Sequence, residues 1–211
     1  MAGCGCHGYS LSHGHAQPPG EHGRLGDGTR GSRPQAVTAT DLRYPIGPFA
    51  APLPLDEAGR AEAVATIVGT PARLREAVAG LDDVQLDTPY RPDGWTVRQV
   101  VHHVPDSHLN AYVRFKLALT EDHPTIKPYD QVAWAGLSDS AGPIGPSLEM
   151  LDLLHQRWVR VLREMSAGDF NRTFNHPEEG VLTLDILLGL YAWHGPHHVA
   201  HITALRARMG W

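Results

Sequence analysis

The sequence LLGLYAWHGPHHVAHITAL (residues 187–205) decides how the rest of the chain is interpreted. At about 100° per residue, one helical stripe collects a set of residues that is apolar at both ends and rich in imidazole in the middle. Its members are Leu187, Leu190, Tyr191, His194, His198, His201 and Leu205. Because the ends of the stripe are apolar, we expect it to face the core of the protein.

His194 and His198 are four residues apart, so their side chains should project from adjacent turns of this helix. Two imidazoles at this spacing can bind one metal ion. The alternative is that they are ordinary core histidines with satisfied hydrogen bonds. Three histidines on one stripe, with His197 at its edge, favour a metal site, because burying several unpartnered imidazoles is costly.

Length, charge and cysteine content narrow the class of protein. The 211 residues fit one folded domain. A net charge of −5 with scattered Lys and Arg gives no reason to expect nucleic acid. No apolar run reaches the roughly 18 residues of a membrane span, so we expect no membrane association. Cys4 and Cys6 form no disulfide framework, and we expect a cytoplasmic protein.

Residues 1–43 are rich in Gly, Ser, Pro and His and lack apolar periodicity, which predicts a disordered extension before a domain at 44–211. The extension also lacks the apolar segment of a secretory signal. It could bind metal loosely through Cys4, Cys6, His7, His13 and His15. We favour an unstructured leader, part of which is untranslated if the true start codon lies downstream.

The domain itself shows four amphipathic helical patterns, at about 56–81, 96–119, 147–166 and 183–209. Gly69-Thr70-Pro71 predicts a kink or restart in the first, and Pro105 a kink in the second. Thr96 and Gln99 form a capping-box signature, and Thr183 caps the last helix. The fold class is therefore all-α, a four-helix bundle.

Two connections stand out in this bundle. The segment from about 121 to 146, between the second and third helices, is long enough to act as a lid or rim over a site. Residues 171–180 are rich in turn-forming types and are consistent with a small hairpin.

A third metal ligand should come from the second helix, because a catalytic zinc site needs three protein ligands. His103 lies on a polar stripe with Gln99, Asp106 and Asn110, which solvent exposure alone would also explain. His108 lies on the apolar side. Periodicity does not choose between His103 and His108, whereas His102 points away and is the weakest candidate.

Several motifs, taken together, resemble those of the DinB-like superfamily, and within it the branch of YfiT-type metal-dependent hydrolases. The motifs are Gly94-Trp-Thr-Val-Arg-Gln-Val-Val-His-His103 with Asp106-Ser-His108, Trp193-His-Gly-Pro-His-His-Val-Ala-His-Ile202, Leu86-Asp-Thr-Pro-Tyr-Arg, Arg114-Phe-Lys-Leu, Lys127-Pro-Tyr-Asp and Arg208-Met-Gly-Trp211. The resemblance covers about residues 44–211 and says nothing of the extension.

The resemblance implies a four-helix bundle, commonly a homodimer, that binds one divalent metal ion per subunit. The implied ligands are His103, His194 and His198, with His197 and His201 around them. Imidazole ligands suit zinc, which we expect first, and nickel among others.

Such a site predicts an enzyme that acts on a small molecule. Three neutral ligands leave the ion a free position, where a water is acidified and a carbonyl polarised, as in a hydrolase. The same position could activate a low-molecular-weight thiol, such as bacillithiol, for transfer to an electrophile. A third possibility is metal binding without turnover. Asp106 is the one carboxylate that we nominate as a catalytic group, although a solvated helix carboxylate would look the same.

Overall fold

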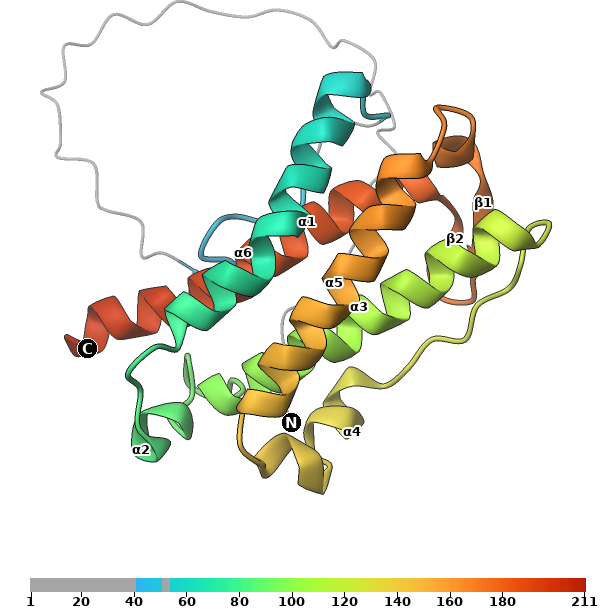
Figure 1. Ribbon diagram of the computed structural model, residues 1–211. Helices are drawn as coiled ribbons and strands as arrows, with labels where there is room; N and C mark the ends of the chain where they lie inside the picture. Colours follow the sequence, from blue (N-terminus) through green and yellow to red (C-terminus); the bar gives the residue numbers. More distant parts are fainter. Residues whose placement is uncertain (1–40, 51–53) are drawn as a thin grey trace, which may run out of the picture.

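The computed structural model describes residues 41–50 and 54–211, and it is built on four long helices (Figure 1). They are α1 (Glu57–Ala77), α3 (Val97–Thr120), α5 (Gly145–Glu164) and α6 (Leu184–Met209). Helices α1 and α3 each pack against both α5 and α6. The predicted four-helix bundle is confirmed, whereas Cys4, Cys6 and the histidines of the extension lie outside the described residues.

The capping residues read from the sequence begin two of these helices. The Thr96 hydroxyl accepts a hydrogen bond from the Gln99 backbone N–H, and the Gln99 side chain accepts one from the Thr96 N–H. The Thr183 hydroxyl accepts from the Ile186 N–H at the start of α6. These contacts satisfy N–H groups that would otherwise lack a helical partner. None of the described helices has the length and apolarity needed to cross a membrane.

Three of the long helices contain an internal proline: Pro71 in α1, Pro105 in α3 and Pro196 in α6. Helix α1 runs unbroken through Pro71, so the restart that we considered at Gly69-Thr70-Pro71 does not occur. A proline has no N–H to offer to the carbonyl four residues earlier. At Pro71 the carbonyl that loses its helical donor belongs to Ile67.

The connections contain short elements that the sequence pattern did not predict. They are α2 (Asp83–Leu86), α4 (Gln131–Ala135) and the 3-10 turns η1 (Ser138–Ala141) and η2 (Asp169–Asn171). The expected hairpin is present, formed by β1 (Thr173–His176) and β2 (Gly180–Thr183), which pair antiparallel with Thr173 opposite Thr183. It leads directly into α6 (Figure 1).

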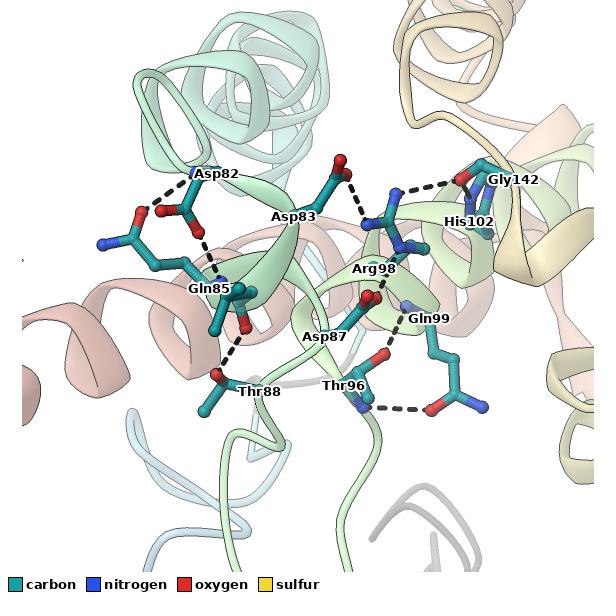
Figure 2. Close-up of polar contacts among 11 residues, drawn as sticks. Asp82, Asp83, Gln85, Asp87, Thr88, Thr96, Arg98, Gln99, His102 and Gly142 are labelled. Carbon is teal, nitrogen blue, oxygen red and sulfur yellow. Dashed lines mark hydrogen bonds and ion pairs between the residues drawn. The ribbon is translucent and has the colours of Figure 1, made fainter.

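A buried arginine fastens the first turn of α3 to its surroundings (Figure 2). Arg98, only 7% exposed, forms ion pairs with Asp83 at 2.8 Å and Asp87 at 2.6 Å. It also donates to the carbonyl of Gly142, before α5. Because a buried guanidinium is costly without partners, these contacts fix α2 and the α5 approach against α3.

His102 of α3 contacts the start of α5 and the Gly142 carbonyl that Arg98 also contacts, not the histidines of α6. Its Nδ1 lies 2.7 Å from the Ser147 hydroxyl and its Nε2 lies 3.2 Å from the Gly142 carbonyl oxygen. Both ring nitrogens thus have local partners at the α3–α5 contact. Its position agrees with its weak candidacy as a metal ligand.

The apolar core is divided into two clusters along the bundle. One surrounds Phe115 and Trp158, and the other surrounds Val101 and Ile202. Between them, the long helices α3, α5 and α6 contribute buried imidazoles instead of apolar side chains. These are His103, His108, His155, His194, His197, His198 and His201, which we call the histidine layer.

Candidate metal centre

Three side chains of the histidine layer converge at one point. His103 comes from α3, and His194 and His198 come from adjacent turns of α6. One ring nitrogen of each lies within 4.8 Å of those of the other two, and the Nε2 atoms of His103 and His194 are 3.4 Å apart. The structure therefore brings together the three residues that the family resemblance implied as ligands.

Burial keeps this histidine triad uncharged. Desolvation, with smaller contributions from His197 and His201, lowers the pKa of His103 from 6.5 to about 3. Burial likewise lowers the pKa of His194 and His198 well below 6.5. At neutral pH each imidazole is neutral and carries one nitrogen lone pair, which is the form that ligates a metal.

The donor set fits a divalent transition metal. Within the described ranges, no other group of three His, Cys, Asp or Glu side chains places its ligand atoms this close together. Three imidazole nitrogens without a carboxylate suit zinc, nickel or copper rather than calcium or magnesium. A fourth position would stay open for water or substrate.

Two further histidines of α6 flank the triad. His197 stacks on Trp193 with ring centroids 4.1 Å apart, and in the described part of the chain neither of its ring nitrogens has a hydrogen-bond partner. His201 stacks on Tyr90 and lies 3.0 Å from the Arg43 carbonyl, to which its Nε2 donates. Arg43 lies near the end of the extension that was predicted to be disordered (residues 1–43). The last residues of this extension therefore contact the folded domain.

Periodicity could not choose between His108 and His103 as the third ligand. In the structure His108 lies beside the triad, in contact with His194. Its Nε2 is 3.2 Å from Nδ1 of His194, and its Nδ1 is 2.8 Å from Nε2 of His155. His155 was missed in the sequence analysis. The signal was present, because His155 lies four residues after Leu151 and three before Trp158 on the buried stripe of α5.

Asp106 is one turn beyond His103 on α3 but is not part of the triad. Its side chain is half-buried. Burial, and secondarily the negative charge of Asp139, raise the pKa of its carboxyl from 3.8 to about 6. A carboxyl that titrates near neutral pH can both give and take a proton under physiological conditions.

Tyr129, from the long connection between α3 and α5, is a second group that sequence reasoning did not select. The Ser107 side chain interacts with its phenol group, and the Ser107 hydroxyl lies 3.4 Å from Nε2 of His194. Burial raises the pKa of the Tyr129 phenol, and its ring packs 4.6 Å from that of Trp134. The connection that we predicted as a lid or rim thus reaches a residue in contact with the triad.

Comparison with known proteins gives consistent matches. A family model described as "DinB superfamily" matches residues 66–202. Relatives from Bacillus cereus and Bacillus thuringiensis subsp. konkukian are each 56% identical over 171 residues, covering 81% of this chain and 99% of the relative. Both carry the name "Putative metal-dependent hydrolase".

A solved structure also matches. It is YfiT from Bacillus subtilis, described as "a probable metal-dependent hydrolase with an unusual four-helix bundle topology". It is 48% identical, with a TM-score of 0.78, and the match covers 81% of this chain and 98% of YfiT. The resemblance drawn from the sequence motifs is confirmed.

Proposed function

The chain belongs to the DinB superfamily, and on that premise we propose that it is a metal-dependent hydrolase of a small-molecule ester or amide. The observation that carries the proposal is the convergence of His103, His194 and His198, three buried and neutral imidazoles whose ligand atoms lie within 4.8 Å of one another. We propose one divalent ion per subunit, zinc first and nickel second.

An ion with three neutral protein ligands keeps its double charge and an open position, so when bound it supplies a Lewis acid that acidifies water. The protein contributes the remaining groups. With a pKa of about 6, Asp106 is suited to take up and return a proton near neutral pH. Tyr129 keeps its phenol proton because burial raises its pKa, and it can donate a hydrogen bond to a substrate oxygen.

A small substrate is favoured by the enclosure of the site. The triad is buried, and the connection carrying Tyr129 and Trp134 packs against α3, the helix that provides His103. We also propose, from the resemblance alone, that the protein is a homodimer. Light scattering after size-exclusion chromatography would show a single peak of twice the 23.0 kDa chain mass, and a peak at the chain mass would contradict it.

The proposed activity can be tested with zinc-loaded protein, p-nitrophenyl acetate as an ester probe and p-nitroacetanilide as an amide probe. We expect turnover of at least one probe by the wild type and by His123→Ala, a control at an exposed histidine outside the triad. We expect His194→Ala to lose both bound zinc and turnover. Hydrolysis by His194→Ala equal to that of the wild type would refute the proposal.

The thiol transferase and the binding-only alternatives are separated by a parallel assay. The same zinc-loaded protein is mixed with monochlorobimane and with bacillithiol, mycothiol or glutathione in turn. Thiol conjugation that needs zinc and His194, without hydrolysis, would establish the transferase. Stoichiometric zinc without turnover in either assay would support metal binding alone.

A further inference from the structure

A chain of hydrogen bonds crosses the bundle and uses one residue from each long helix. It begins at the Ile67 carbonyl of α1, which lies 2.8 Å from Nδ1 of His155 in α5. Nε2 of His155 lies 2.8 Å from Nδ1 of His108 in α3. Nε2 of His108 lies 3.2 Å from Nδ1 of His194 in α6, one of the triad residues. We call this sequence of contacts the imidazole chain.

The carbonyl end sets the position of every proton in the imidazole chain. A carbonyl oxygen only accepts, so the Nδ1 of His155 must carry a hydrogen. In a neutral ring its Nε2 is then an acceptor, and Nδ1 of His108 must donate to it. By the same argument Nε2 of His108 accepts from Nδ1 of His194. Nε2 of His194 is left with its lone pair, 3.4 Å from Nε2 of His103.

This assignment requires that all three imidazole rings be neutral, and their burial favours the neutral form. His108, His155 and His194 are at most 4% exposed. The ring of Trp158 contacts both His108 and His155 edge-on, with centroid distances of 5.8 and 5.7 Å. An added proton would be held in an apolar setting, and the pKa values of all three fall below 6.5, mainly because of burial.

The carbonyl is available because of Pro71. In a regular helix the Ile67 carbonyl would accept from the N–H of residue 71, and proline has none. The acceptor freed inside α1 is satisfied instead by His155. A proline that costs helix stability on its own thus provides the fixed end of the imidazole chain.

We propose that His155 and His108 are positioning residues that lock the triad residue His194 in the tautomer with hydrogen on Nδ1, so that its Nε2 lone pair faces the metal position. The proposal rests on the proposed function for the identity of the metal position. The tautomer itself is a property of the metal-free protein. Partners that fix the tautomer and ring orientation of a ligating histidine commonly change metal affinity by about 10- to 100-fold.

The first experiment is nitrogen-15 NMR of the metal-free protein, which distinguishes the two neutral tautomers of each histidine through its long-range ring couplings. We expect His155, His108 and His194 all to carry hydrogen on Nδ1. Hydrogen on Nε2 of His194 in the wild type would overturn the proposal. This readout needs neither zinc nor activity, so it stands or fails separately from the proposed hydrolase.

The second experiment uses His155→Phe, which keeps an aromatic ring but removes the acceptor for His108. His108 can then carry its hydrogen on Nε2 and donate to Nδ1 of His194, which moves the His194 hydrogen to Nε2. We expect this tautomer change by NMR, with zinc affinity lowered about 10- to 100-fold in a competition titration with a chromogenic chelator.

The controls separate positioning from general damage to the fold. His155→Gln keeps a donor and an acceptor and should retain more zinc affinity than His155→Phe. His123→Ala, at an exposed histidine outside the imidazole chain, should match the wild type. If folded His155→Phe kept both the wild-type His194 tautomer and its zinc affinity, the positioning role would be disproved. Should His155→Phe not fold, the wild-type NMR spectrum still decides.

Discussion

Gly195 of α6 faces Thr70 of α1 at a distance that leaves no room for a side chain. A Cβ atom on residue 195 would lie 2.6 Å from Cγ2 and 2.7 Å from Oγ1 of Thr70. Thr70 is fully buried and therefore has little freedom to move aside. The two helices meet this closely next to His194, so the contact fixes the depth at which the histidine layer lies in the bundle.

Replacing Gly195 by Ala should therefore destabilise the protein although alanine favours helix. Overpacking of this kind costs about 1–3 kcal/mol. Urea unfolding would measure the loss, with Gly145→Ala as the control, because a Cβ at Gly145 meets nothing within 4 Å. Equal stability of the two variants would show that Thr70 can be displaced without cost.

Single substitution of any triad residue by alanine should abolish stoichiometric zinc binding, since two ligands rarely hold the ion. Metal content after dialysis, measured by plasma mass spectrometry, is the readout. His102→Ala, at a buried histidine bonded to Ser147, should keep its zinc. Full zinc occupancy in His103→Ala, His194→Ala and His198→Ala would remove the ligand assignment.

The metal-free protein should lose stability as the pH falls below about 6.5. In the unfolded chain histidines take up protons near that pH, whereas burial lowers the pKa of His103 to about 3 and of His155 to about 4. Between these values and 6.5 only the unfolded state binds the proton. Each such histidine then reduces the unfolding free energy by about 1.4 kcal/mol per pH unit.

Thermal unfolding of metal-free protein between pH 8 and pH 5 tests this effect. The midpoint should be nearly constant above pH 7.5 and should fall steadily below pH 6.5. A midpoint that does not change down to pH 5 would mean that the buried histidines are protonated in the folded protein.

Asp106→Asn should lower turnover without changing zinc content, because Asp106 is not in the triad. If Asp106 acts as the proton acceptor, wild-type activity should fall below about pH 6, where the carboxyl is protonated. Asp139→Asn should shift this acid-side fall in activity to lower pH, since Asp139 raises the pKa of Asp106. An unchanged pH profile in Asp106→Asn would exclude the residue from proton transfer.

Pro71→Ala should weaken zinc binding from a distance. Alanine restores the N–H that competes with His155 for the Ile67 carbonyl, while it removes a helix-breaking residue. We therefore expect equal or greater thermal stability together with lower zinc affinity. Pro105→Ala, at an internal proline of α3 outside the imidazole chain, is the control. Unchanged zinc affinity in Pro71→Ala would show that His155 keeps its bond.

The long helices could be predicted from the sequence because their signals are local. Thr96 with Gln99 and the apolar periodicity placed α3 correctly, and the stripe from Leu187 to Leu205 placed α6. The short helices α2 and α4 were missed, since a four- or five-residue helix shows less than two turns of periodicity. Helix α1 ends at Ala77, four residues earlier than the pattern suggested.

The candidate site was predictable only in part. The spacing of His194 and His198 follows from one helix, whereas the choice between His103 and His108 depends on which helices face each other, and periodicity does not contain that information. The family resemblance selected His103. The burial of His155 could have been read from the apolar stripe of α5, but its role, like that of Tyr129, depends on partners in other elements that periodicity does not show.

The histidine layer also determines how the helices align along their axes. Apolar ridges can interlock at more than one axial offset between two helices. The hydrogen bond from His155 to the Ile67 carbonyl can form at only one of these offsets. Sliding a helix by one turn, about 5.4 Å, would leave imidazoles unpaired in an apolar core at about 1–3 kcal/mol each. The residues proposed to serve the metal therefore also select the native register of the bundle over its shifted competitors.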